Sequence, residues 1–184
     1  MPLSISRGAR KAAQARLRQS YADHYGFVWR SLRRLGVEED AVDDAVHDVF
    51  VVAARRLHEF EDRAAVTSWL FAVAIRVAKH KRRALARHLR RTEAVANRAK
   101  TRTPARDPYA QHDAARTLHA LLQRLDDKLR HAFILMELEQ MTGKEAAATL
   151  GIKVATAHSR LRLAREQLRA HAAELAGQDV RRSA

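Results

Sequence analysis

The sequence predicts an all-α protein, and its composition carries that prediction. The 184 residues include 36 alanines but only 6 glycines and 3 prolines. A sandwich or barrel of strands needs many tight turns, which so few glycines and prolines cannot supply. Alanine, leucine, arginine and glutamate, which form helices readily, are abundant instead. The length allows one domain or two small ones.

Three helices are predicted in the first half of the chain. Residues 1–19 carry five basic and no acidic side chains and form a basic N-terminal arm. A helix with apolar residues three and four positions apart follows and ends at Gly36. The second helix opens with three consecutive acids, which favour a helix N-terminus, and runs to Leu57. After a short polar loop, the third helix spans about 66–89.

Two prolines divide the chain. Pro104 and Pro108 each disfavour helix at the preceding residue, and basic and polar residues surround them. We therefore expect residues 92–112 to be a flexible linker between two small helical domains. The two domains and the C-terminal tail are then residues 20–91, 113–172 and 173–184.

The stretch from Met141 to Arg169 has the pattern of a helix-turn-helix. Thr142 and Glu145 form a T-x-x-E capping box, which sets the start of a helix. That helix is short, Gly151 supplies the turn, and a longer helix follows. An ordinary pair of antiparallel helices with a charged outer face has the same pattern, so that alternative stays open.

The second helix of this pair has the composition of a recognition helix. A major groove admits one α-helix, whose first turns contact base edges. His158, Ser159 and Arg162 fall on one face at helical spacing, opposite an apolar face. Arg160 and Arg165 flank the exposed face and suit phosphate contacts, which position a protein on DNA without specifying the sequence.

The charge of the chain indicates a polyanionic partner. The formal net charge is +14 and the isoelectric point is about 11.2. Residues 79–106 alone hold eleven basic and one acidic side chain. Nucleic acid is the commonest partner of such a sequence. A solvated face or a disordered tail would be the alternative, but the run begins on an apolar helical pattern, which places part of it on a folded surface.

Several kinds of site are disfavoured. The absence of cysteine excludes disulfides, thiolate zinc sites and a cysteine nucleophile. Ten histidines occur without an H-E-x-x-H spacing, and we expect no bound metal. No phosphate-binding loop, nucleophile elbow or G-x-G-x-x-G occurs, so we expect neither an enzyme nor a cofactor. No apolar run reaches the ~18 residues of a membrane span and no secretory signal is recognisable, which predicts a cytoplasmic protein.

Two groups of motifs resemble the sigma factors of bacterial RNA polymerase. In the first half, DAVHDVF at 44–50, WLF at 69–71 and IRVA at 75–78 are similar to sigma region 2. In the second half, ELEQMTGKEAA at 137–147, LGI at 150–152 and TAHSRL at 156–161 are similar to sigma region 4. The resemblance covers about residues 20–172. Two such regions and a short linker are the layout of the extracytoplasmic-function (ECF) group.

The resemblance implies a promoter-specificity subunit that acts with core RNA polymerase on promoter DNA. The first helical domain would dock on the β′ clamp helices and the second on the β flap. The residues implied for polymerase binding are Asp43, Asp44, His47 and Asp48. Those implied for the melted minus-ten element are Phe60, Arg76, Lys79, His80, Lys81, Arg82 and Arg83. Those implied for the minus-thirty-five element are Thr156, His158, Ser159, Arg160, Arg162 and Arg165.

The resemblance also implies that an anti-sigma factor is a possible partner, and no obligate homo-oligomer is expected. Two other classes of protein share parts of the pattern. A stand-alone helix-turn-helix regulator would normally dimerise on a two-fold site, and the sequence offers no long heptad for a dimer. A basic structural or RNA-binding protein would bind without sequence preference and with steep salt dependence. Transcription from a chosen promoter with purified polymerase separates the three.

Overall fold

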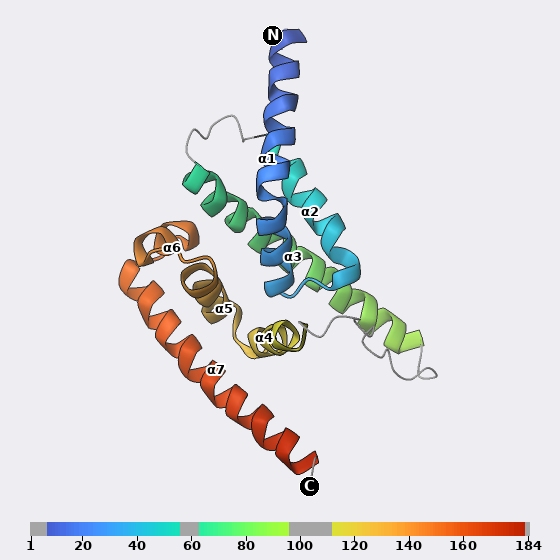
Figure 1. The fold of residues 1–184 in the computed structure, drawn as a ribbon. Coiled ribbons are helices and arrows are strands. Elements are labelled where there is room, and N and C mark those ends of the chain that lie inside the picture. The colour runs from blue at the N-terminus through green and yellow to red at the C-terminus, as the bar shows by residue number, and fades with distance from the viewer. Residues whose placement is uncertain (1–6, 56–62, 96–111, 183–184) are drawn as a thin grey trace.

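The computed structural model describes residues 7–55, 63–95 and 112–182, and these residues are almost entirely helical (Figure 1). The elements in chain order are α1 (Arg7–Arg34), α2 (Glu39–Ala53), α3 (Arg63–Val95), α4 (His112–Arg124), α5 (Asp127–Phe133), a π-helical turn η2 (Ile134–Leu138), α6 (Gly143–Leu150) and α7 (Val154–Arg182). The described ranges contain no strand, so the all-α prediction is confirmed. None of their helices is long and apolar enough to cross a membrane.

Three helices are longer than the sequence predicted. α1 begins inside the predicted basic arm, α3 continues to Val95 and α7 continues to Arg182 through the predicted tail. The extra residues are rich in alanine and arginine and include no proline, so nothing in them ends a helix. Of the predicted linker 92–112, the first four residues therefore belong to α3 and His112 belongs to α4. Residues 96–111, with both prolines, lie outside the described residues.

The first three helices pack around a common apolar core. Most of the apolar positions at helical spacing are buried or partly buried, although Tyr21 is exposed. The fully buried side chains include Val28, Leu32, Val42, Val46, Val49, Leu70 and Phe71. Trp69 packs against this core while partly exposed, as expected for a residue on the apolar face of α3. At one end of the core the rings of Tyr21 and Phe50 lie 4.6 Å apart, which ties α1 to α2.

The apolar spacing of residues 127–139 predicts a single helix, but that helix is interrupted in the structure. It is α-helical to Phe133, and then one wider turn follows in which the Glu139 N–H donates to the carbonyl of Ile134, five residues back. Gln140 then takes a positive φ of 55°, and the Met141 N–H donates to the carbonyl of Leu135. The wide turn and the positive φ redirect the chain between α5 and α6.

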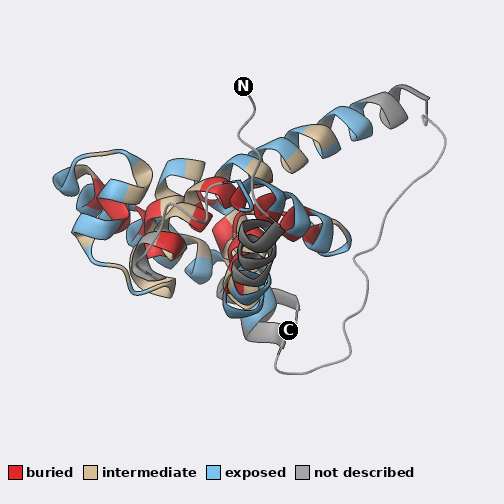
Figure 2. Cartoon of the chain, turned by 90° about the horizontal axis from the view of Figure 1, so that it is seen from above, coloured by how far each residue is buried: buried red, intermediate tan, exposed pale blue. Residues whose placement is uncertain are grey.

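The second half of the chain packs directly on the first. Ile134, Leu135 and Ala146 are fully buried and belong to the same apolar core as α1, α2 and α3. A second, smaller cluster around Leu122 and Ala164 holds α4 against α7. Figure 2 shows the buried residues lying together in the body of the molecule, while the C-terminal part of α3 projects from it and is mostly exposed.

Charged contacts reinforce this packing between the two halves. Arg34 at the end of α1 pairs with Glu139 beyond η2. Arg82 of α3 pairs with Asp127 of α5 at 2.7 Å. Gln123 of α4 donates from its amide nitrogen to the carbonyl of Arg34 at 3.3 Å. The described residues therefore form one packed body in this structure, with α6 against α3 and α4 against α1.

Candidate nucleic-acid interface

The helix-turn-helix is built as its sequence predicts. Both halves of the capping box are present at the start of α6: the Glu145 N–H donates to Thr142 Oγ1 at 3.3 Å, and the Thr142 N–H donates to the Glu145 carboxylate at 2.8 Å. The hydrogen bonds from Thr142 lower the pKa of Glu145 below its ordinary value. α6 ends at Gly151, whose φ of 63° is a left-handed conformation that favours glycine.

Small side chains let α6 and α7 approach closely. Ala146 and Ala147 of α6 are buried, as are Ala157, Leu161 and Ala164 of α7, and the two helices are in contact. The predicted inward face of the recognition helix is confirmed by this burial. The opposite face of α7 is left on the outside of the molecule (Figure 1).

That outer face carries the residues predicted for the minus-thirty-five element. His158, Ser159, Arg162 and Arg165 are exposed, and Thr156 and Arg160 are partly buried. Acidic side chains hold two of the arginines. Arg162 pairs with Glu166 one turn further along α7 at 2.6 Å, and Arg165 pairs with Glu137 of η2.

The basic run predicted for the minus-ten element lies on α3. Arg76, Lys79, His80 and Arg83 are exposed there. The other two cations of the run are partly buried and paired: Lys81 with Asp48 of α2 at 2.9 Å, and Arg82 with Asp127 of α5. Phe60, which the resemblance also implies for the minus-ten element, lies outside the described residues.

The acidic residues predicted for a basic partner lie together on α2. Asp43, Asp44, His47 and Asp48 are all exposed on its outer side, opposite the buried valines. The Tyr25 hydroxyl donates to Asp43 at 2.9 Å, and this hydrogen bond raises the pKa of Tyr25 above its ordinary value. Since Asp48 also pairs with Lys81, the acidic face of α2 and the basic run of α3 lie side by side.

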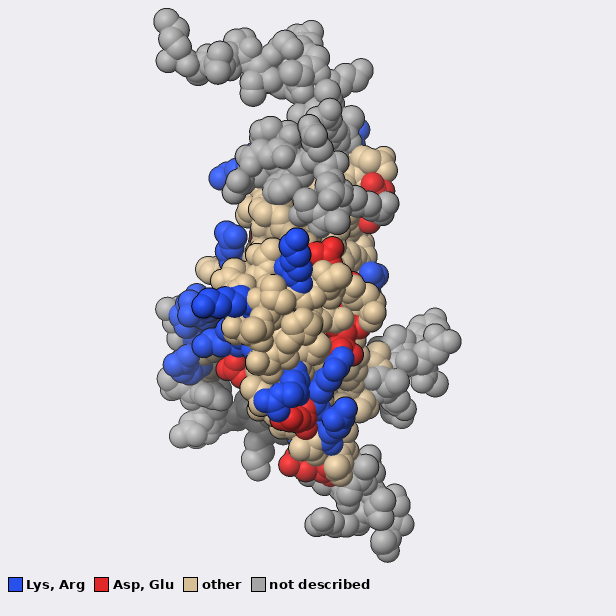
Figure 3. Space-filling view, turned by 90° about the vertical axis from the view of Figure 1, so that its left-hand side faces the viewer, with Lys and Arg blue, Asp and Glu red and all other residues tan. Residues whose placement is uncertain are grey.

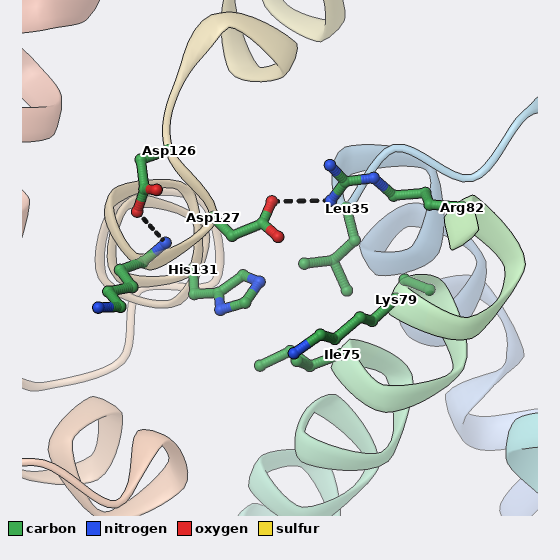
Figure 4. Close-up of a pocket in the computed structure, with 9 residues that line it drawn as sticks. Leu35, Ile75, Lys79, Arg82, Asp126, Asp127 and His131 are labelled. Atoms are coloured by element: carbon green, nitrogen blue, oxygen red, sulfur yellow. Dashed lines mark hydrogen bonds and ion pairs between the residues drawn. The ribbon is translucent and has the colours of Figure 1, made fainter. Parts of the chain in front are cut away.

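Sequence analysis missed a cavity of about 330 Å³ between α3 and α5 (Figure 4). Lys79 and Arg82 line it from α3, and Asp126, Asp127 and His131 line it from the other side. Burial lowers the pKa of His131 to about 4. No local sequence signal marks this site, because its walls come from segments about 45 residues apart.

The surface of the molecule mixes both signs of charge. On the face shown in Figure 3, Lys and Arg side chains gather in groups that have Asp and Glu side chains beside them. In the described part of the chain, no three His, Cys, Asp or Glu side chains come together in a way that could hold a metal ion. The arrangement can present cations to a polyanion, and four of them are paired with acidic side chains.

Two family models match most of this chain. Residues 20–92 match the family model of sigma-70 region 2, and residues 115–168 match that of sigma-70 region 4. The chain belongs to the sigma-70 family. Members of this family are transcription initiation factors rather than catalytic enzymes, and the chain directs promoter-specific initiation of transcription. Nothing in the comparisons supports a stand-alone regulator.

Curated relatives confirm the resemblance to ECF sigma factors over nearly the whole chain. RNA polymerase sigma factor NccH of Alcaligenes xylosoxydans xylosoxydans is 28% identical over 172 residues, which cover 91% of this chain and 92% of NccH. ECF RNA polymerase sigma factor SigC of Mycobacterium tuberculosis is 27% identical over 180 residues, which cover 94% of this chain and 89% of SigC.

Solved structures show the same fold. CnrH in complex with the cytosolic domain of CnrY superposes with a TM-score of 0.66 and 27% identity, covering 90% of this chain and 94% of CnrH. The sigma factor RpoE of Bartonella quintana, in complex with the anti-sigma factor NepR, superposes with a TM-score of 0.62 and 23% identity, covering 82% of this chain and 92% of RpoE. The second likeness shows the fold alone.

Proposed function

We propose that this sigma factor binds core RNA polymerase through the acidic face of α2 and contacts two promoter elements through α3 and α7. Residues 20–91 and 113–172 are then its two working units, with the β′ clamp helices and the β flap as their docking sites. The protein performs no chemical step of its own and acts in the cytoplasm. One observation supports this most directly: a capped helix-turn-helix with an exposed cationic face stands in the same chain as an acidic helix beside a basic one.

The polymerase surface is assigned to α2 because four polar residues share its exposed side. Asp43, Asp44, His47 and Asp48 fit a basic partner surface by charge. Asp44 is the most informative of them, since Asp43 and Asp48 also support neighbouring helices through Tyr25 and Lys81. Changing Asp44 therefore tests docking with the least effect on the fold.

The two DNA surfaces differ in how they present their cations. Arg162 lies in the first half of a helix after a tight turn, held by Glu166, which suits contacts to base edges in a duplex. Arg76, Lys79 and Arg83 lie exposed along the side of the long helix α3, which suits phosphates and a melted strand. The first surface would specify sequence and the second would add affinity.

Run-off transcription with purified core polymerase tests this function. We expect the wild-type chain to select promoters from a library and Asp44→Lys to reduce binding to core polymerase. Arg162→Ala should relax the selectivity at one or two positions of the minus-thirty-five element, by ~1–3 kcal/mol. Arg83→Ala should weaken all promoters equally and reduce the salt slope by roughly one unit. Asp23→Lys, an equal change of charge at an exposed site on α1, is the control for Asp44→Lys.

Two outcomes would contradict the assignments. If wild type and Asp44→Lys bind core polymerase equally well, α2 is not the docking surface. If Arg162→Ala and Arg83→Ala have identical promoter profiles, α7 does not specify sequence while α3 adds affinity.

A regulatory protein partner is part of the proposal. CnrH, which is similar over 90% of this chain, was solved with the cytosolic domain of CnrY, and RpoE was solved with the anti-sigma factor NepR. An anti-sigma factor that binds this chain would compete with core polymerase, and the same run-off reaction would measure that competition.

A further inference from the structure

Gly143, the first residue of α6, lies against the imidazole of His158 in the second turn of α7. A methyl carbon built on Gly143 would come within 2.9 Å of His158 Cε1 and 3.1 Å of Cδ2, and nearer still to Nε2. These are the three atoms nearest to that carbon. Only a residue without a side chain leaves room for the ring in this position.

The backbone at Gly143 does not itself require glycine. The glycines with positive φ among the described residues are Gly36 and Gly151, so Gly143 has a conformation open to any residue. Alanine forms helices better than glycine, and the helix start is already fixed by Thr142 and Glu145. The ring of His158 is the neighbour that an added side chain would meet.

We infer that Gly143 is a positioning residue for promoter recognition: it seats the His158 ring against the start of α6 and so fixes which base edge His158 reaches in the minus-thirty-five duplex. This rests on the proposed role of α7. The neighbouring cations of α7 are held by charge, Arg162 by Glu166 and Arg165 by Glu137. The space left by Gly143 lets the His158 ring lie against the start of α6 before DNA binds, and a side chain placed in advance loses less freedom on binding.

A side chain added at Gly143 would clash with the His158 ring, and the effect on the protein depends on which of the two moves. The clash is with the far end of an exposed side chain, so the ring turns away while both helix backbones stay in place. Gly143→Ala should therefore leave the melting temperature unchanged or raise it, and still change DNA recognition. A merely structural glycine would give the opposite result.

Promoter profiling by holoenzyme tests the inference with four full-length proteins: wild type, Gly143→Ala, His158→Ala and the double variant. We expect His158→Ala to relax the preference at one base pair by roughly 5- to 150-fold, and Gly143→Ala to relax it at the same base pair. The double variant should relax the base-pair preference no more than His158→Ala alone, because Gly143 acts only through the His158 ring. Gly26→Ala is the matched control, since its added methyl would meet only the end of the Arg30 side chain, at 3.1 Å.

The inference is overturned if the two single effects add, or if Gly143→Ala keeps the wild-type profile while His158→Ala changes it. It is also overturned if His158→Ala leaves the promoter profile unchanged. In that case, the profile of Arg162→Ala shows whether only the inference about Gly143 fails or the proposed role of α7 fails too. If Arg162→Ala changes the promoter profile, α7 still contacts the promoter and only the inference about Gly143 is wrong. If Arg162→Ala leaves the profile unchanged, the proposed role of α7 is wrong as well.

Discussion

Arg130 joins the two halves of the chain through a single buried side chain. Arg130 is 2% exposed, and its guanidinium donates to the carbonyls of Leu122, Gln123 and Leu125 at 2.7, 3.3 and 2.8 Å. The carbonyls at the end of a helix have no partner within the helix, so Arg130 completes the end of α4. It also reaches the carbonyl of Leu35 in the first half, at 3.5 Å.

Removing this guanidinium should be costly. Arg130→Met keeps the length of the side chain but leaves several buried carbonyls without a donor, so we expect unfolding to become easier by ~3–5 kcal/mol. Arg124→Met is the control: Arg124 is the last residue of α4 and is 39% exposed in a surface pair with Glu174, which predicts a loss below about 1 kcal/mol. Urea unfolding of both variants measures the difference, and equal losses would contradict this role of Arg130.

His131 makes the stability of the protein depend on pH. Burial beside Arg130 and Arg82 lowers its pKa from 6.5 to about 4, although Asp127 and Asp126 act in the opposite direction. Between these two values the unfolded chain binds a proton that the folded protein does not. Stability contributed by this group is therefore complete above about pH 6.5 and is lost as the pH falls toward 4, by up to about 3 kcal/mol.

Urea unfolding across this pH range checks the assignment to His131. We expect His131→Gln to flatten the slope of stability against pH. A slope in His131→Gln equal to that of wild type would show that other groups are responsible.

At the scale of one element, two threonines of the helix-turn-helix have opposite expected effects. Thr142 caps α6, so Thr142→Ala should destabilise the protein by roughly 0.5–2 kcal/mol. Thr149 lies at the other end of α6 and its hydroxyl donates to the carbonyl of Glu145 at 2.8 Å, a bond that slightly disfavours a helix. Thr149→Ala should be neutral or stabilising. Thermal melts distinguish the two, and similar losses would show that α6 is not held by its cap.

The same element shows what a sequence can predict. The limits of α6 follow from Thr142, Glu145 and Gly151, because a cap and a left-handed glycine act within a few residues. The lengths of α1, α3 and α7 could not be predicted as well, since their extra residues favour helix but carry no stop signal. The wide turn after Phe133 was missed because its apolar spacing is that of an ordinary helix.

Contacts between distant segments were the least predictable part of the site. The exposed faces of α2 and α7 follow from helical spacing. In the structure, the residues predicted for these two faces are exposed or partly buried. The pairing of Arg34 with Glu139 joins residues 105 positions apart, and nothing local distinguishes these two from other surface charges. The cavity beside His131 was missed for the same reason.

At the scale of the whole molecule, the two DNA surfaces proposed on α3 and α7 lie in one packed body. Two elements centred about 25 base pairs apart are separated by roughly 85 Å of duplex at ~3.4 Å per base pair. In this structure, α6 packs on α3 and Arg82 pairs with Asp127 at 2.7 Å, so the two DNA surfaces belong to one compact body. Residues 96–111 could span at most about 55 Å when extended. If α3 and α7 contact these two elements as proposed, we expect promoter binding to separate α4–α7 from α1–α3.

The pair Arg34–Glu139 gives a test of that separation outside the proposed DNA and polymerase surfaces. Its side chains are only 24% and 11% exposed, so Glu139→Arg should leave two cations facing each other between the halves. We expect this variant to have a larger radius of gyration in X-ray scattering. We also expect it to bind core polymerase more tightly, since less of it is held in the packed form.

The charge swap and a neighbouring control make the test specific. Arg34→Glu combined with Glu139→Arg restores opposite charges and should return both the radius and the affinity toward wild type. Glu39→Arg reverses the charge opposite Arg33, the neighbour of Arg34, but that pair lies wholly within the first half and should leave the radius unchanged. If the swap stays as expanded as the single reversal, or if Glu139→Arg keeps the wild-type radius, the ion pair does not hold the halves together. The apolar contacts of Ile134, Leu135 and Ala146 would then be the ones that polymerase has to separate.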